Sequence, residues 1–125
     1  MPKQKILIVD DDAAIVVAVQ FLLEQHGFQI KVAWSGEEAL AAIEKEPPDL
    51  ILLDIMLPVK DGFEVCQRVR ENNDWKDIRI LFVTALGYDA TAAKGMALGA
   101  DGFIAKPFAN ADLVAKIKGL LACPA

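Results

Sequence analysis

Residues 50–54 of the chain read Leu-Ile-Leu-Leu-Asp, a run of four large apolar side chains that stops at an acid. Residues 6–10 repeat the pattern as Ile-Leu-Ile-Val-Asp. A short apolar run without alternation is typical of a strand buried on both faces, as in a parallel sheet that is covered by helices. The two runs therefore predict inner strands over residues 6–9 and 50–53, each followed by an aspartate.

The sequence around these two strands continues an alternation of strand and helix. Further strands are predicted over residues 28–33, 78–83 and 103–105, and helices over residues 13–26, 36–44, 62–72, 90–98 and 111–122. Four of the helix starts carry a side chain suited to capping, namely Asp12, Ser35 (with Glu38 completing a capping box), Asp89 and Asn110. Five strands alternating with five helices predict an α/β fold with one doubly wound, five-stranded parallel sheet.

Size and charge narrow the class of protein. A chain of 125 residues is expected to form one domain, residues 1–125. Its net charge of -5 argues against direct DNA binding and against anionic membranes. No apolar stretch approaches the ~20 residues of a membrane helix, and no signal-peptide pattern opens the chain, which predicts a cytoplasmic protein. Cys66 and Cys123 are expected to be free thiols.

Polar residues follow the strands at the points where the strands end. Asp10 and Asp11 follow the first predicted strand, Asp54 the third, Thr84 the fourth and Lys106 the fifth. Because the carboxyl ends of parallel strands meet at one edge of the sheet, we expect these residues to lie close together. Like charges at ~4 Å cost about 4 kcal/mol at an effective dielectric of 20, so the carboxylates require a cation. Oxygen ligands without a nearby His or Cys favour Mg²⁺ or Mn²⁺, and Mg²⁺ commonly shares phosphate oxygens with a substrate.

This set of residues predicts phosphoryl chemistry. A carboxylate beside a divalent ion can attack phosphorus and form an aspartyl phosphate when a cation and a hydrogen-bond donor meet the transferred oxygens. Asp54 is the candidate nucleophile, and Lys106 and Thr84 are the candidate cation and donor.

Taken together, these residues resemble the receiver domains of bacterial two-component response regulators, in particular the chemotaxis-receiver-like, stand-alone receivers. The resemblance covers essentially the whole chain. The motifs that carry it follow one another in the expected order and spacing: Asp10-Asp11, residues 52–58 (LLDIMLP), Asp61-Gly62, Thr84-Ala85 and Lys106-Pro107-Phe108. The resemblance implies the strand order 2-1-3-4-5, which is the order of the chemotaxis receiver.

The resemblance also implies a role for each site residue. Asp54 would be the phosphoacceptor, and Mg²⁺ (or Mn²⁺) would be held by Asp10, partly through water, by the Asp11 and Asp54 side chains and by the Met56 carbonyl. Thr84 would hydrogen-bond to the phosphoryl group, Lys106 would pair with it through a cis Lys106-Pro107 turn, and Thr84 and Phe103 would form the switch. The alternative for Phe103 is a plain core aromatic.

The function implied is a phosphorylation-activated signalling switch rather than an enzyme. A histidine kinase or phosphotransfer protein would supply the phosphoryl group, and a downstream effector protein would make the output. Neither Met56 nor Leu86 can orient a water molecule by hydrogen bonding, so slow autodephosphorylation is expected. A domain cut from a longer protein would have the same sequence as a stand-alone regulator.

Assembly is predicted from positions that are charged in the winged-helix, DNA-binding subfamily. Those receivers pair through charged residues on the fourth helix, fifth strand and fifth helix. In this chain the matching positions include Ala92, Ala97 and Gly102, and only Lys116 keeps its charge. The sequence therefore predicts a monomer or a different dimer.

The first predicted helix carries more apolar residues than one buried face requires. Ile15, Val19, Leu22 and Leu23 form a stripe at helical spacing. Val17 and Phe21 lie on the opposite side of the helix, where they could meet a kinase or phosphotransfer partner. The alternative is that Phe21 packs under a neighbouring element such as the last helix.

Three other interpretations are weighed against the receiver prediction. Asp12 is expected to cap a helix rather than to bind metal, and His26 to contact a helix end rather than to act as a base. Phosphohydrolases of the haloacid-dehalogenase type have a second acid two residues after the nucleophile, where this chain has Met56. A flavodoxin-like nucleotide site requires a glycine-rich turn, where this chain has three acids at residues 10–12.

Overall fold

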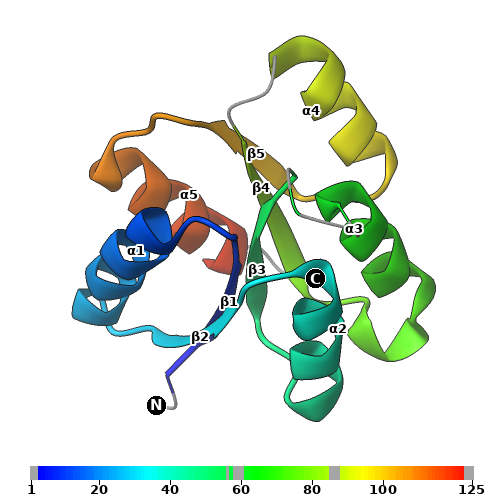
Figure 1. Cartoon of the computed structure of the whole chain (residues 1–125), viewed down its shortest axis with the longest axis horizontal. Coiled ribbons are helices and arrows are strands. Elements are labelled where there is room, and N and C mark those ends of the chain that lie inside the picture. Colours follow the sequence, from blue (N-terminus) through cyan, green and yellow to red (C-terminus); the bar gives the residue numbers. More distant parts are fainter. Residues whose placement is uncertain (1–2, 56, 58–60, 85–87, 123–125) are drawn as a thin grey trace.

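The computed structural model describes residues 3–55, 57, 61–84 and 88–122, with the backbone alone for residues 84 and 88–92. Five strands form one parallel sheet: β1 (Lys5–Val9), β2 (Gln29–Ala33), β3 (Leu50–Asp54), β4 (Arg79–Thr84) and β5 (Gly102–Ala105). Their order is β2-β1-β3-β4-β5, so the predicted topology is confirmed (Figure 1). From β1 the sheet grows to one side with β2 and to the other side with β3, β4 and β5, so the strand order reverses between β1 and β3. Ligands bind at this point in folds of this class.

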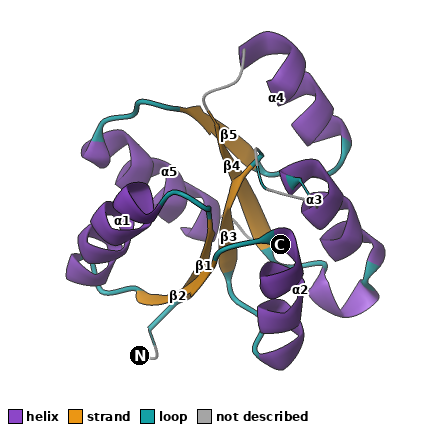
Figure 2. Cartoon of the chain, viewed as in Figure 1, coloured by secondary structure: helices purple, strands orange, loops and turns teal. Residues whose placement is uncertain are grey.

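Helices cover both faces of the sheet (Figure 2). Their bounds are α1 (Ala13–Gln25), α2 (Gly36–Lys45), α3 (Gly62–Glu71), α4 (Tyr88–Ala97) and α5 (Asn110–Ala122), with a 3-10 turn η1 (Asn73–Trp75) that was not predicted. The helices α1 and α5 lie on one face, and α2, α3 and α4 on the other. Because side chains alternate across a strand, Leu53 and Phe82 pack in one core cluster while Leu52 and Leu81 pack in the other. No helix in the described ranges is long and apolar enough to cross a membrane.

Two of the predicted helix caps are confirmed. Asp12 accepts hydrogen bonds from the N–H groups of Ala14 and Ile15, at 3.0 and 3.4 Å. The Ser35 hydroxyl accepts one from the N–H of Glu38 at 3.2 Å. The reciprocal bond expected of a capping box is displaced by one residue, because the Glu38 carboxylate accepts from Trp34 rather than from Ser35.

The other two predicted caps are wrong. The helix α4 begins at Tyr88, so Asp89 lies inside it. The helix α5 begins at Asn110, and the Ala109 carbonyl accepts from the N–H groups of Asp112 and Leu113, which places Ala109 at the cap position. A residue with a capping side chain is also tolerated in the first turn, so its presence fixes a helix start only to within one or two residues.

The end of α4 is anchored by an arginine that sequence reasoning missed. The Arg70 guanidinium donates to the Gly99 carbonyl at 2.7 Å, to the Ile78 carbonyl at 2.8 Å and to the Asp101 carboxylate at 2.7 Å. Asp101 also accepts from the N–H of Ile80. Gly99 has a φ of 101°, and a Cβ there would lie 2.9 Å from the Arg70 side chain. Glycine is therefore required at this position both by the backbone conformation and by the close approach of Arg70. One side chain therefore joins α3, β4 and the turn before β5.

Candidate functional site

The strand register brings the predicted acids together. Val9 pairs with Leu53, so Asp10 and Asp54 are each one residue further along neighbouring strands. Both are buried, with exposed fractions of 4% and 7%, whereas Asp11 is exposed. Carboxylate oxygens of Asp10, Asp11 and Asp54 all lie within 4.8 Å of one another. The predicted cluster is therefore present at the carboxyl edge of the sheet.

Lys106 reaches this cluster from the end of β5. Its ammonium group donates to Asp10 at 3.0 Å and to Asp54 at 3.3 Å. Burial, the largest single influence, lowers the pKa of Lys106, but the hydrogen bonds and charges of Asp10 and Asp54 together outweigh it and raise the pKa. The lysine is therefore held as a cation between two buried carboxylates.

Backbone contacts fix the Asp10 carboxylate and the helix that begins beside Asp54. The second oxygen of Asp10 accepts from the N–H of Asp12 at 2.9 Å. Asp61 caps α3 by accepting from Glu64 at 3.0 Å. At Gly62 an added Cβ would lie 2.4 Å from the Asp54 carbonyl oxygen, so only glycine lets α3 approach the main chain of β3 this closely.

The remaining predicted site residues are placed in part. The strand β4 ends at Thr84, which pairs with Ala105, so its backbone lies at the same edge as Asp54 and Lys106. Met56 and Leu86, like the Thr84 side chain, lie outside what the structure describes. The Lys106-Pro107 bond is cis, as predicted. Phe103 is buried, and its ring centroid lies 6.5 Å from that of Phe82.

The donor set fits a hard divalent cation. The three acids offer oxygen atoms alone, and of them Asp11 is open to solvent while Asp10 and Asp54 face inward. Three carboxylates gather here and, among the described residues, the Lys106 ammonium pairs with two of them, so a divalent cation would further reduce the repulsion among them. Mg²⁺ prefers such oxygen ligands and retains some of its water ligands. The exposed side of the cluster, at Asp11, leaves room for them.

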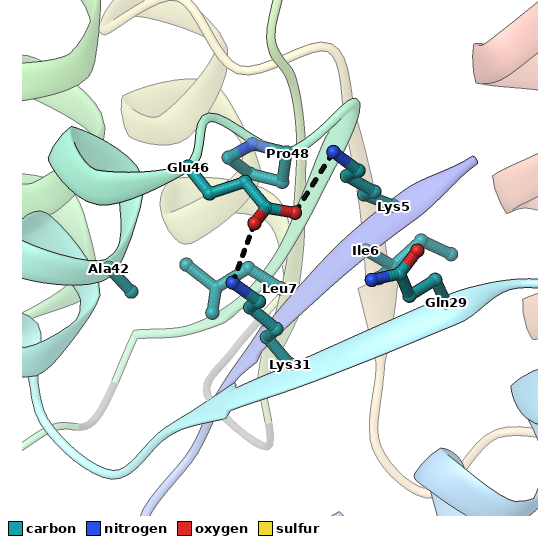
Figure 3. A pocket seen from close by; sticks show the side chains of 8 residues that line it. All are labelled: Lys5, Ile6, Leu7, Gln29, Lys31, Ala42, Glu46 and Pro48. Atoms are coloured by element: carbon teal, nitrogen blue, oxygen red, sulfur yellow. Dashed lines mark hydrogen bonds and ion pairs between the residues drawn. The ribbon is translucent and has the colours of Figure 1, made fainter. Parts of the chain in front are cut away.

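A pocket at the end of the sheet opposite the acidic cluster is lined by side chains that form ion pairs with one another (Figure 3). There Glu46, which follows α2, pairs with Lys5 at 2.9 Å and with Lys31 at 3.0 Å. The hydrogen bond from Lys5, with that from Lys31 and the two charges, lowers the pKa of Glu46. The three side chains are substantially exposed, so these ion pairs contribute little to stability.

Two other titratable groups lie apart from the acidic cluster. Cys66 is buried on α3, and burial raises the pKa of its thiol to about 11, so it stays protonated. His26 ends α1, and its Nδ1 lies 2.9 Å from the Leu22 carbonyl oxygen. Cys66 is therefore a free thiol and His26 contacts the end of α1, as predicted, while Cys123 lies outside the described residues.

The apolar residues on the outer face of α1 are exposed. Val17 is 65% and Phe21 63% exposed, whereas Val19 and Leu23 are buried. The alternative in which Phe21 packs under the last helix is therefore wrong. Val16, which the predicted stripe left out, is also buried.

Comparisons with known proteins agree with this geometry. Residues 6–118 match the family model described as the response regulator receiver domain. The CheY-like receiver domain protein of Methanospirillum hungatei has a TM-score of 0.90 and 34% identity, with 96% of this chain and 94% of that one covered. The chemotaxis protein CheY4 of Vibrio cholerae has a TM-score of 0.90 and 33% identity, with 95% and 99% covered.

Curated sequence relatives include longer proteins. The alkaline phosphatase synthesis transcriptional regulatory protein PhoP of Bacillus subtilis is 42% identical over 118 residues, which is 94% of this chain and 48% of that protein. The chain spans about half the length of the curated relatives it matches. Receiver domains are phosphoacceptors rather than classical enzymes. With its sheet order, its acidic cluster and a family match over residues 6–118, the chain belongs to the response regulator receiver domains.

Proposed function

We propose that this chain is a signalling switch that accepts a phosphoryl group on Asp54 from a histidine kinase or phosphotransfer protein, with Mg²⁺ in the acidic cluster. The observation that carries the proposal is the buried Asp54 carboxylate within 4.8 Å of two further carboxylates and 3.3 Å from the Lys106 ammonium. The conformational change caused by phosphorylation is then transmitted to a downstream effector protein. Slow hydrolysis of the aspartyl phosphate returns the switch to its resting state.

Each residue of the site has its own role in the proposed phosphoryl transfer. An Asp54 oxygen forms the new bond to phosphorus while the bond between phosphorus and the donor's nitrogen breaks, and the electron pair leaves with the donor imidazole. Asp10, Asp11, Asp54 and the Met56 carbonyl would hold Mg²⁺, which would neutralise charge on the carboxylates and the phosphoryl oxygens. Lys106 pairs with a phosphoryl oxygen, and Thr84 donates a hydrogen bond to another as Phe103 adjusts to it.

Phosphorylation by a small donor tests this proposal. Incubation with acetyl phosphate and Mg²⁺ is expected to add one phosphoryl mass to the native chain, as measured on the intact protein. Asp54→Asn removes the nucleophile but keeps the side-chain volume, so it is expected to acquire none. An equal adduct on Asp54→Asn, or none on the native chain with Mg²⁺ present, contradicts the proposal.

The exposed face of α1 supports a docking site for the phosphoryl donor. The helix starts at Ala13, directly after the acidic residues, and presents Val17 and Phe21 to solvent. A partner that delivers a phosphohistidine to Asp54 must cover the surface beside it. Exposed apolar side chains four residues apart offer such a partner an area to bury.

Transfer from a cognate kinase is expected to fall at least about fivefold in Phe21→Ser and less in Val17→Ser, because an aromatic side chain at the centre of an interface contributes about 1 kcal/mol or more. Phosphorylation by acetyl phosphate and the thermal midpoint should stay close to native values, since both residues are exposed. Met96→Ser, at an exposed apolar residue on α4, is the matched control. Native transfer rates in Phe21→Ser would remove α1 from the docking site.

The assembly prediction concerns the face formed by α4, β5 and α5. Ala97 and Gly102 stand at positions that carry charge in receivers of the winged-helix subfamily, and Lys116 alone retains one. Without opposite charges to pair, phosphorylation is not expected to produce a dimer through this face. Light scattering of the phosphorylated chain should give the mass of the unphosphorylated chain, and a doubled mass that Lys116→Ala abolishes would contradict the prediction.

A further inference from the structure

An exposed tryptophan stands at the same edge of the sheet as the acidic cluster. The strand β1 lies between β2 and β3, and its Val9 pairs with both Ala33 and Leu53 (Figure 1). The residues that follow these three positions lie at one level across the sheet: Trp34, Asp10 and Asp54. Neighbouring strands are about 4.8 Å apart, so the main chain at Trp34 lies about 10 Å from that at Asp54.

The turn between β2 and α2, residues 34–35, presents this tryptophan to solvent. Trp34 is 41% exposed, whereas the other tryptophan of the chain, Trp75, is half-buried and packs against the core. The Trp34 N–H donates to the Glu38 carboxylate at 3.3 Å, and the next residue, Ser35, caps α2. A large aromatic side chain on a fixed backbone loses little conformational entropy when a partner covers it.

The size of a protein interface brings Trp34 within reach of a protein that reacts at Asp54. A stable interface buries about 800 Å² on each partner, and a round patch of that area extends roughly 15 Å from its centre. A patch centred on Asp54 therefore includes the turn that carries Trp34, about 10 Å away. A molecule as small as acetyl phosphate does not span that distance.

The charges beside Trp34 restrict the kind of partner that fits. Residues 10–12 are three aspartates, and residues 34–38 contribute two glutamates and no basic residue. Of these five acids only Asp10 is buried. Charges of one sign attract a partner of the opposite sign and disfavour others. A matching partner has an apolar side chain for the tryptophan and lysine or arginine residues beside it.

We infer that Trp34 is a contact residue for the protein that phosphorylates Asp54, and that this partner covers residues 34–35 with an apolar side chain flanked by basic residues. The inference rests on the proposed function, because it assigns a further contact to the proposed phosphoryl donor. It extends the docking site from the outer face of α1 to the end of β2. Phosphorylation by a small donor does not use this contact.

Trp34→Ser tests the contact. The donor is a histidine kinase fragment that carries a labelled phosphohistidine and is selected for transfer to the native chain. The KM for transfer to Trp34→Ser should rise at least about fivefold with kcat little changed, because the loss of an aromatic hot-spot side chain weakens an interface by at least this factor. Trp34→Tyr should recover most of the affinity. Labelling by acetyl phosphate and the thermal midpoint should stay close to native in both variants.

Two charge reversals on α2 test the acidic surround. Glu37 lies in the first turn of the helix, near Trp34, whereas Glu44 lies two turns further along, about 10 Å away. Glu37→Lys should lower kcat/KM for transfer about three- to tenfold at low salt, and the loss should shrink at high salt. Glu44→Lys changes the net charge equally and should stay within about twofold of native.

Fluorescence gives a readout that a purely structural role does not change. Trp75→Phe leaves Trp34 as the single tryptophan, because the chain has two. Its emission should shift to shorter wavelength when the unphosphorylated kinase fragment binds and covers the indole. Unchanged emission at a saturating concentration of the fragment contradicts the contact.

Failure of the inference and failure of the proposed function are distinguishable. If the kinase fragment phosphorylates the native chain and Trp34→Ser with equal KM, the contact is absent and the proposed function stands. A loss of acetyl phosphate labelling as large as the loss of kinase transfer would instead assign Trp34 to the structure of the site. If labelled histidine kinases transfer nothing to the native chain, both the proposed donor and the inference fail.

Discussion

Asp11→Ala is expected to lower the affinity for Mg²⁺ by more than about 100-fold, because the loss of a direct ligand should exceed the 10- to 100-fold cost of losing an outer contact. Asp11 is the exposed member of the cluster, so its carboxylate is the one most accessible to an incoming ion. The same change removes a like charge within 4.8 Å of two others. Since this charge is exposed, its removal should stabilise the metal-free protein by about 1 kcal/mol.

The neighbouring Asp12 provides a control of the same residue type. Its side chain caps α1 through Ala14 and Ile15, so Asp12→Ala should cost about 1 kcal/mol of stability and leave Mg²⁺ binding unchanged. Urea unfolding and Mg²⁺ titration of both variants measure the two quantities separately. Native Mg²⁺ affinity in Asp11→Ala, or a loss of affinity confined to Asp12→Ala, would mean that the metal ligands are wrongly assigned.

Lys106→Met is expected to destabilise the metal-free protein by about 1–3 kcal/mol and to slow phosphoryl acceptance strongly. The substitution leaves the buried Asp10 and Asp54 carboxylates without the ammonium group that contacts both. Removal of one partner from a buried ion pair is costly because the other charge stays buried. Mg²⁺ should recover part of the lost stability in this variant, since it neutralises the same carboxylates.

The contribution of Lys106 should also depend on pH. Because Asp10 and Asp54 raise its pKa in the folded state despite burial, its stabilising effect is fully present below the pKa of an unfolded lysine and is lost as pH rises through the folded value. The stability of the native protein should therefore decline above about pH 10 more steeply than that of Lys106→Met. Lys118→Met, at an exposed lysine of α5, should behave like the native protein. Equal unfolding midpoints for the native chain and Lys106→Met would contradict this role.

The parts of the fold that follow from local pattern could be predicted. The apolar runs at β1 and β3 have the composition of strands buried on both faces, and a strand that ends on an acid places that acid at the sheet edge whatever the tertiary detail. That is why Asp10 and Asp54 could be brought together before their register was known. Asp12 could be assigned to the helix because its partners are only two and three residues away.

Features that depend on distant segments could not be predicted. The Arg70 and Asp101 pair joins residues 31 positions apart, and nothing in either local sequence marks the other. The close approach of Gly95 in α4 to the Phe82 ring likewise depends on how α4 lies over the sheet. For Phe21, the helical pattern gave the side of α1 it occupies, but only the packing of neighbouring elements decides whether that side is covered.

The central claim is that Asp54 itself carries the phosphoryl group. Its most direct test is to phosphorylate the native chain with acetyl phosphate and Mg²⁺, reduce it with borohydride, which converts an aspartyl phosphate to homoserine, and map the product by peptide mass spectrometry. We predict a single modified residue, Asp54, with Asp10 and Asp11 unchanged. Homoserine at Asp10 or Asp11, or at no position in a sample whose intact mass shows the adduct, would contradict the claim.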